Sequence, residues 1–270
     1  MVAGAGAKLL LVGCGKMGGA MLEGWLARGL AASDAIVAEP VEALRPKKPG
    51  LRCVTSSQDV RETPKIVVLA VKPQTMDAVL PDLRRFADEG AVFLSIAAGK
   101  TLTYFASHLG ATAKVVRSMP NTPAAVRQGI TVACASPGVS AAEKKRCQGL
   151  LEAVGQALWV EDESLLDPVT ALSGSGPAYV FLLVEAMAAA GAKLGLTPDM
   201  AMQLARATVA GSGELLKQSS EPASQLRVNV TSPGGTTAEA LKVLMAPDGI
   251  QPVFDKALAA ASRRSKELAG

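Results

Sequence analysis

Short apolar runs alternate with amphipathic stretches through the first part of the chain. The apolar runs predict strands at residues 8–12, 35–38, 66–71, 92–96, 114–117 and 130–134. The stretches between them predict helices at residues 17–27, 75–86, 101–108 and 141–154. Continuous apolar strands that alternate with helices are typical of a parallel sheet covered on both faces. We therefore predict an α/β fold with a mostly parallel sheet.

The strand pattern ends after about residue 162. Helical spacing then predicts helices at residues 176–194, 198–216, 236–245 and 252–268. The start of the second of these is well marked, because Thr197 is a good N-cap and Pro198 fits the first helical turn. We predict two domains, one of residues 1–162 that holds the sheet and an all-helical one of residues 163–270.

The composition limits the partners of this protein. Apolar residues make up 49% of the chain but aromatic residues only 3%, so the core must consist mainly of Ala, Val, Leu, Ile and Met. The net charge is +4, and the basic residues are scattered apart from short runs such as 45–48 and 263–266. Nucleic-acid binding needs a dense basic patch with stacking aromatic residues. We expect no nucleic-acid partner.

The cysteines and the N-terminus bear on metal content and location. The four cysteines form no Cys-x-x-Cys pair and the chain has one histidine, which argues against a zinc site and a disulfide framework. We expect no metal and a cytoplasmic protein with reduced thiols. Residues 1–8 lack the charged start and long apolar region of a signal peptide.

One stretch approaches the composition of a membrane span. Residues 174–192 carry a single charge, on Glu185, and a bilayer span needs about 20 apolar residues. Pro177, the many alanines and the central glutamate favour a helix buried between protein surfaces instead. We expect no membrane partner.

A glycine-rich turn follows the first predicted strand and opens the first predicted helix. Its sequence has the pattern Gly-x-Gly-x-x-Gly of a dinucleotide-binding turn, in the required context. Gly13 permits the tight turn, Gly15 allows the backbone to approach a pyrophosphate, and Gly18 allows the helix to pack on the strand. The helix N-terminus offers N–H groups to the phosphates. The predicted coenzyme ligands here are Gly13, Cys14, Gly15, Lys16, Met17 and Gly18.

Glu39 stands at the end of the second predicted strand, about 20 residues beyond the turn. An acidic residue there accepts hydrogen bonds from the adenosine ribose hydroxyls and favours NADH, because it repels the 2′-phosphate of NADPH. Arg45 is close enough in sequence to compensate for that repulsion. An exposed loop carboxylate without this role is the alternative.

Three further loops follow strand ends, where such sheets face their ligands. Lys72 is predicted either to lie near the coenzyme or to hold a neighbouring loop, and Asn121 either to meet the nicotinamide carboxamide or to support the site. Small residues after the fourth clear strand leave room for a nicotinamide. A purely structural turn remains the alternative for each loop. The predicted ligands are Ala70, Val71, Lys72, Pro73, Ala97, Ala98 and Asn121.

Two glycine-rich segments interrupt the helical half, at residues 172–179 and 229–239. The second concentrates hydroxyls and backbone N–H groups at a predicted helix start, and such a nest suits a small carboxylate. A capping box between Thr236 and Glu239 is the alternative, and taken alone it is the favoured one.

The chain resembles the pyrroline-5-carboxylate reductase family, the last enzymes of proline biosynthesis, over essentially its whole length. The glycine turn, Ala-Val-Lys-Pro, Met-Pro-Asn-Thr-Pro, Leu-Ser-Gly-Ser-Gly-Pro-Ala-Tyr and Ser-Pro-Gly-Gly-Thr-Thr occur in the order and spacing of that family. The resemblance implies a Rossmann domain, a helical dimerisation domain, reduction of Δ1-pyrroline-5-carboxylate with NADPH or NADH, and homodimers that often form decamers. The family usually carries a small or hydroxyl residue where Glu39 stands, so the coenzyme preference stays open.

The resemblance also implies where the substrate binds. Ser232 and the backbone at Gly235, Thr236 and Thr237 would hold the substrate carboxylate, and the Thr237 hydroxyl would meet the ring nitrogen as the catalytic contact. Asn229 and Val230 would line the junction of substrate and coenzyme. The implied substrate ligands are Val230, Ser232, Gly234, Gly235, Thr236 and Thr237, and Asn229 is added to the coenzyme ligands.

Hydride transfer to a C=N bond needs few acid–base groups, because a protonated imine is already electrophilic and the protein mostly has to position and desolvate the reactants. We expect the substrate to arrive protonated or to take its proton through water, and His108 to be structural. A 3-hydroxyacid dehydrogenase is a rival, but Lys193 lacks the Gly-x-x-x-Lys spacing of those enzymes. A non-enzymatic nucleotide-sensing protein is the second rival.

Overall fold

The computed structural model describes residues 9–269, which form two compact units. The first unit contains the chain up to Gly174 together with the C-terminal residues from Ala261 onward, and the second contains Ser175–Ala260. The predicted strand residue Lys8 and the N-terminal segment 1–8 lie outside the described residues. The domain boundary expected after residue 162 stays a prediction.

The first unit is built on one eight-stranded sheet. Its strands are β1 (Leu9–Val12), β2 (Ala35–Ala38), β3 (Arg52–Val54), β4 (Ile66–Leu69), β5 (Val92–Ser95), β6 (Lys114–Met119), β7 (Gly129–Ala135) and β8 (Gly155–Trp159). Their order across the sheet is β3-β2-β1-β4-β5-β6-β7-β8, and every pair is parallel except β6 with β7. The prediction of a mostly parallel sheet is therefore confirmed.

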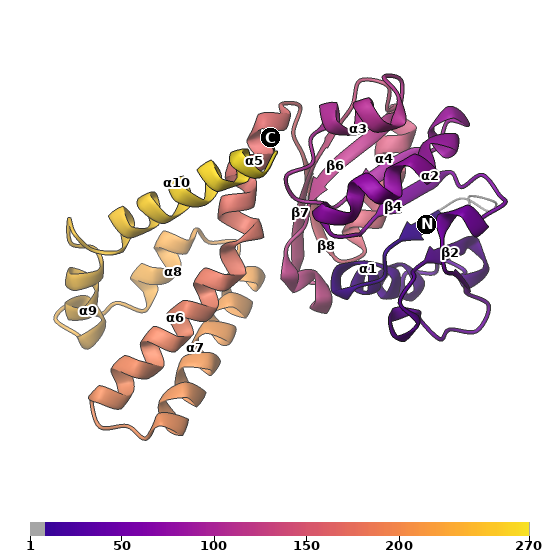
Figure 1. The fold of residues 1–270 in the computed structure, drawn as a ribbon. Helices are drawn as coiled ribbons and strands as arrows, with labels where there is room; N and C mark the ends of the chain where they lie inside the picture. The colour runs from indigo at the N-terminus through magenta and orange to yellow at the C-terminus, as the bar shows by residue number, and fades with distance from the viewer. Residues whose placement is uncertain (1–8, 270) are drawn as a thin grey trace. The chain divides into compact units, whose positions relative to one another are not determined.

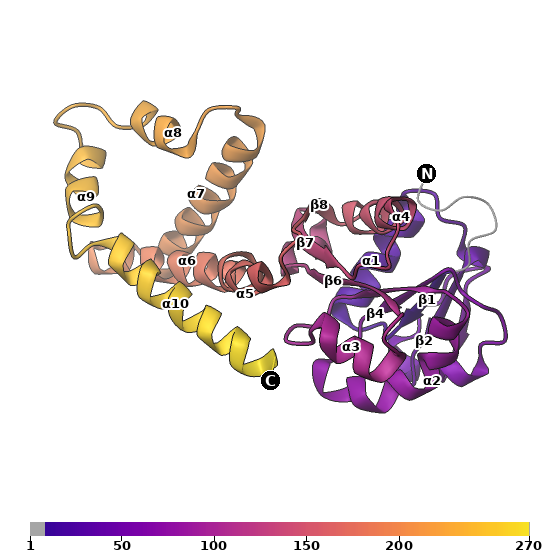
Figure 2. The same cartoon turned by 90° about the horizontal axis from the view of Figure 1, so that it is seen from above.

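Helices cover both faces of this sheet. α1 (Lys16–Ala27) and α4 (Ala141–Glu152) pack on one face, and α2 (Met76–Asp88) and α3 (Leu102–Leu109) pack on the other (Figures 1 and 2). Successive strand side chains point to opposite faces, so Leu9 and Leu11 join the first core while Leu10 joins the second. The order in which successive strands join the sheet reverses at β1, whose parallel neighbours are β2 on one side and β4 on the other. Sheets of this kind bind ligands outside the strand ends at that point.

The sequence patterns missed both edge strands of the sheet. β3 has only three residues and none of them is fully buried, so it carries no continuous apolar run. β8 alternates between half-buried and exposed residues, so it too lacks a continuous apolar run, and it begins directly after the predicted end of the fourth helix at residue 154. β4 ends at Leu69 rather than at the predicted residue 71, because Ala70 and Val71 turn against the glycine-rich turn.

The second unit is helical. Its elements are α6 (Gly176–Lys193), α7 (Pro198–Gln218), α8 (Ala223–Asn229), α9 (Thr236–Leu244) and the first half of α10 (Ile250–Ala269). A short α5 (Leu166–Val169) and the end of α10 belong to the first unit. The predicted Thr197 cap is confirmed, since its hydroxyl accepts a hydrogen bond from the Met200 N–H. Helix α8 was missed, and its seven residues include few apolar ones. The described residues after 162 contain no strand, as expected.

The core of the second unit is small. Ala188 on α6 packs with Ala201 and Ala205 on α7, and these short side chains allow the two helices to approach closely. Many large apolar side chains on the same helices stay exposed, among them Phe181 and Leu182. Within the described chain, the helical stretch Glu163–Lys193 is long and apolar enough to cross a membrane by length and composition. The core helices of soluble proteins can share these properties.

Candidate coenzyme and substrate sites

The three glycines of the turn after β1 each have a separate structural reason. Gly13 has φ +90°, and a Cβ there would lie 2.9 Å from the Ala70 carbonyl oxygen. A Cβ at Gly18 would lie 2.4 Å from the Gly13 carbonyl oxygen, so this glycine allows α1 to start close against the turn. A Cβ at Gly15 would meet nothing within 4 Å. The turn is therefore tightly packed at Gly13 and Gly18 and open at Gly15.

The first turn of α1 is suited to an anion. Gly15 is its N-cap, no side chain caps it, and its first turn contains no acidic residue. Its N–H groups and the positive end of the helix dipole are therefore available to a ligand. The open backbone at Gly15 and the uncapped helix together fit the pyrophosphate of a dinucleotide.

Glu39 is buried rather than exposed, which rules out the exposed loop carboxylate. It is 5% exposed, and its Oε2 accepts a hydrogen bond of 2.7 Å from the backbone N–H of Cys14 in the glycine turn. Its Oε1 accepts one of 2.9 Å from the Val41 N–H. The carboxylate is thus fixed beside the predicted phosphate-binding turn.

The loop after β4 lies against the same turn. The Ala70 N–H donates to the Val12 carbonyl at 2.8 Å, and Val71 contacts the Cβ position of Gly13. The Lys72 carbonyl accepts hydrogen bonds from the N–H and hydroxyl of Thr75 and so starts the short 3-10 helix that begins at Pro73. The Lys72 side chain is exposed. The predicted coenzyme ligands at 70–73 therefore follow the end of β4, and the first two of them, Ala70 and Val71, lie against the glycine turn.

The loop after β5 consists of small residues, and hydrogen bonds that involve Ser95 and Ser118 hold its start in place. The Ser95 hydroxyl accepts from the Ala97 N–H at 3.2 Å, and the Ser95 carbonyl accepts from the Ser118 hydroxyl at 2.8 Å. Ala97 is buried and Ala98 is half-buried. Gly99 has φ +74°, and a Cβ there would lie 2.9 Å from the Leu268 carbonyl oxygen, so the last turn of α10 lies against this loop.

Asn121 supports its own loop. Its Oδ1 accepts a hydrogen bond of 3.0 Å from the Ile130 N–H at the start of β7. The sequence left two roles open for Asn121, and this contact agrees with the one in which it supports the site. Contact between Asn121 and the nicotinamide carboxamide stays a prediction.

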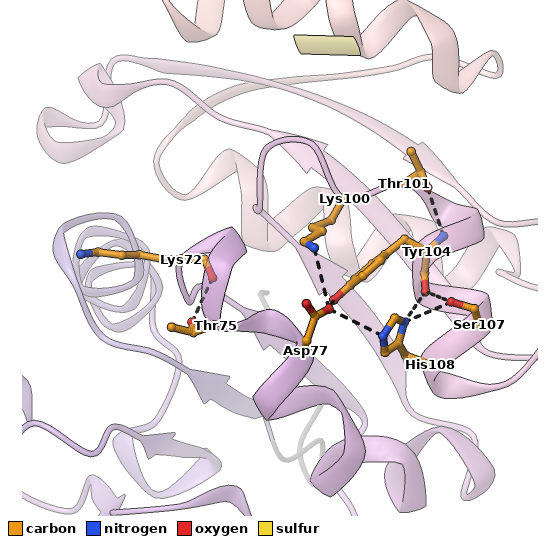
Figure 3. A network of polar contacts seen from close by, with 8 residues as sticks. All are labelled: Lys72, Thr75, Asp77, Lys100, Thr101, Tyr104, Ser107 and His108. Carbon is orange, nitrogen blue, oxygen red and sulfur yellow. Dashed lines mark hydrogen bonds and ion pairs between the residues drawn. The ribbon is translucent and has the colours of Figure 1, made fainter. Parts of the chain in front are cut away.

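His108 belongs to a polar network between α2 and α3. Figure 3 shows Lys100, Tyr104 and His108 gathered around Asp77, while Lys72 extends away from this group. The Tyr104 hydroxyl donates to Asp77, and the His108 Nε2 lies 3.6 Å from the Asp77 carboxylate. The hydrogen bond from Tyr104 lowers the pKa of Asp77; desolvation opposes it, and the charges of Lys100 and His108 lower the pKa further. The network holds two helices together, in keeping with a structural His108. Sequence reasoning did not find it, because its members come from α2, from α3 and from the loop that precedes α3.

The predicted substrate segment lies in the second unit, from the end of α8 to the start of α9. The α9 N-cap is Gly235, and no side chain caps the helix. The capping box expected between Thr236 and Glu239 is therefore wrong: Thr236 is already inside the helix, and the Glu239 carboxylate accepts a hydrogen bond of 2.6 Å from Lys242 instead. The other interpretation of this segment, a nest of backbone N–H groups and hydroxyls for a small carboxylate, stays a prediction.

The residues before α9 are mostly exposed. Asn229 ends α8, and its amide accepts from Gln225 at 2.8 Å and donates to Glu221 at 3.0 Å. Val230, Ser232 and Gly234 are exposed, and Thr237 is half-buried. The structure thus places the implied substrate residues on one continuous segment, and the implied coenzyme residues other than Asn229 in the first unit.

Among residues 9–269, no group of three or more His, Cys, Asp or Glu side chains is arranged to hold a metal ion. All four cysteines are free thiols.

Two family descriptions match the chain. "Pyrroline-5-carboxylate reductase dimerisation" matches residues 163–268, and "NADP oxidoreductase coenzyme F420-dependent" matches residues 8–99. The second half of the chain is therefore a dimerisation domain, and the first carries a nucleotide-dependent oxidoreductase domain.

Full-length relatives agree with this assignment. The chain is 41% identical to pyrroline-5-carboxylate reductases of Pseudomonas aeruginosa and Mycobacterium leprae, with 97% of each chain covered in both cases. The solved structure of a pyrroline-5-carboxylate reductase from Coxiella burnetii is 35% identical, with a TM-score of 0.92 over 98% of this chain and 99% of that one. The Plasmodium falciparum pyrroline carboxylate reductase, solved with NADP bound, is 30% identical, with a TM-score of 0.83 over 99% and 100% of the two chains. On this evidence the chain belongs to the pyrroline-5-carboxylate reductase family and is an NAD(P)H-dependent oxidoreductase that reduces Δ1-pyrroline-5-carboxylate to L-proline.

Proposed function

We propose that the segment from Asn229 to Thr237 binds the pyrroline carboxylate and that the turn at Gly13–Gly18 binds the coenzyme that reduces it. The observation that carries the proposal is the start of α9, whose N-cap is a glycine without a side-chain cap. A helix end of this kind leaves its N–H groups for an anion, and the substrate carboxylate is that anion. The substrate ligands proposed here are Val230, Ser232, Gly234, Gly235, Thr236 and Thr237.

The coenzyme is held by the loops at the strand ends of the first unit. The turn and α1 bind the pyrophosphate. Glu39 faces the adenosine ribose, and the small loop after β5 leaves space for the nicotinamide. The coenzyme ligands proposed here are Gly13, Cys14, Gly15, Lys16, Met17, Gly18, Glu39, Ala70, Val71, Lys72, Pro73, Ala97, Ala98, Asn121 and Asn229.

When bound by these residues, the reduced coenzyme would supply a hydride to the imine carbon of the substrate. The π electrons of the C=N bond then move to the ring nitrogen, and a protonated imine becomes a neutral secondary amine. The protein contributes position and exclusion of water. The Thr237 hydroxyl contacts the ring nitrogen and orients it, while the proton enters with the substrate or through water, because a hydroxyl is too weak an acid to supply it.

Two variants of Thr237 test this role. Thr237→Val keeps the shape but removes the hydroxyl, and Thr237→Ser keeps the hydroxyl. We expect the valine variant to lower kcat by about tenfold or more, the effect of one lost hydrogen bond to a charged group, while the serine variant retains most of the turnover. The measurements are NADH and NADPH oxidation at 340 nm and coenzyme affinity by calorimetry. Equal losses of turnover and coenzyme affinity would contradict the assignment.

We also propose that the dimerisation domain forms a homodimer in the cytoplasm and that dimers assemble further into decamers. The exposed apolar side chains of α6 and α7 support the dimer, because helices that are apolar on several sides are normally buried against protein.

A further inference from the structure

We infer that Glu39 and Arg45 together select NADH over NADPH, with Glu39 as the coenzyme contact and Arg45 as the residue that positions it. This inference rests on the proposed coenzyme site. It differs from the sequence expectation, in which Arg45 would offset the repulsion between Glu39 and a 2′-phosphate.

The hydrogen bonds of Glu39 leave it prepared for a ribose diol. A carboxylate has about four lone-pair sites, two on each oxygen. One site on Oε2 is used by the Cys14 N–H and one on Oε1 by the Val41 N–H, at 2.7 and 2.9 Å. One site therefore remains on each oxygen, which matches the two hydroxyl donors of an unmodified adenosine ribose.

A 2′-phosphate offers the opposite chemistry. The phosphate replaces the 2′-hydroxyl donor by a negatively charged group next to the Glu39 carboxylate. Two neighbouring negative charges repel each other. Glu39 cannot turn away freely, because Cys14 is buried and its N–H would lose its partner. The discrimination is thus coupled to the phosphate-binding turn itself.

The Arg45 guanidinium already donates hydrogen bonds to the loop that contains Glu39 and to Thr55. Its Nε donates to the Glu39 carbonyl at 2.7 Å, and its Nη2 donates to the Pro40 carbonyl at 3.0 Å and to the Thr55 hydroxyl at 3.1 Å. A guanidinium binds a phosphate bidentately either through Nε with Nη2 or through its two Nη atoms. Both modes need Nη2, so Arg45 would have to release this loop before it could hold a 2′-phosphate bidentately.

The same bonds explain how Arg45 acts on selection. They join the chain at the end of β2 to Thr55, the residue after β3, and so hold the Glu39–Pro40 turn in place. Without them the carboxylate loses the fixed backbone on which its two N–H bonds depend.

Dissociation constants for NADH and NADPH, measured by calorimetry, test the inference together with kcat/KM for each coenzyme. We expect the wild-type protein to favour NADH by about tenfold or more, and Glu39→Gln to reduce that ratio by about tenfold, the effect of one charge-assisted hydrogen bond. We expect Arg45→Met and Arg45→Lys to weaken NADH binding and to leave NADPH binding nearly unchanged, because neither replacement has the planar fork. The control is Arg52→Met, since Arg52 on β3 pairs with Glu62 and makes no bond to Glu39.

The outcomes separate the inference from the proposed function. A wild-type preference for NADPH, or a selective loss of NADPH binding in Arg45→Met, would overturn the inference. A shifted ratio in Arg52→Met would also overturn it, because the effect would then not depend on the Glu39 loop. Turnover with either coenzyme tests the substrate assignment, whatever the ratio of the two dissociation constants.

Discussion

At the scale of the residue, Cys14 illustrates how the glycine turn controls side-chain chemistry. Its thiol is buried, and burial first and the Glu39 charge second raise its pKa to about 11. Only about one thiol in a thousand is then ionised at pH 8, and the thiolate is the reactive form. We expect iodoacetamide to modify Cys14 far more slowly than glutathione at pH 8, with the rate rising toward pH 11. Peptide mass spectrometry over a time course measures this, and labelling of Cys14 as fast as glutathione would contradict the burial that the structure shows.

At the scale of the element, the start of α4 combines a cap with an ion pair. The Glu143 carboxylate accepts from the Ser140 N–H at 2.8 Å and from Lys114 on β6 at 2.8 Å. Burial opposes ionisation, but the hydrogen bonds from Lys114 and Ser140 outweigh it and lower the pKa of Glu143 to about 2. We expect Glu143→Gln to reduce the free energy of unfolding by about 1 to 2 kcal/mol at pH 7.

The pH dependence of this difference has a defined sign. The folded-state pKa of Glu143 is depressed, so its stabilisation is present above about pH 4.5 and is lost as the pH falls toward 2. Thermal melting of both proteins at pH 7 and at pH 3 measures it. Glu161→Gln is the control, because Glu161 is exposed and its ion pair with Lys144 is 3.7 Å long. A difference that stays constant between the two pH values would contradict the assignment.

At the scale of the whole molecule, the exposed apolar side chains of the second unit predict association. Phe181 and Leu182 on α6 are each 62% exposed, although they are large and apolar. We expect Phe181→Glu to shift the protein from dimer toward monomer in sedimentation velocity, because a charge would be buried without a partner. Leu158→Glu is the matched control, since Leu158 is an exposed apolar residue on β8 of the first unit. A Phe181→Glu protein that remains fully dimeric would place the interface elsewhere.

At the candidate sites, the sequence predicted some features and missed others that depend on tertiary structure. The glycine spacing after β1 and the loops after β4 and β5 could be predicted, because a parallel sheet brings its strand ends to one edge whatever the details of packing. The N-cap of α9 could not be predicted from the sequence. Thr236 and Gly235 are both acceptable N-caps, and only the backbone geometry decides between them. The Asp77 network was likewise hidden, because it depends on how α2 and α3 pack against each other.

The sequence by itself determined the α/β class, the helical second half and the position of the glycine turn between β1 and α1, because periodic apolar runs and fixed glycines act locally. Only the tertiary structure decided the edge strands β3 and β8, which are held by pairing with β2 and β7 rather than by burial of their own side chains. It also decided the role of Arg45. Arg45 lies six positions after Glu39 in the chain, but its hydrogen bond to Thr55 exists only because β3 pairs beside β2.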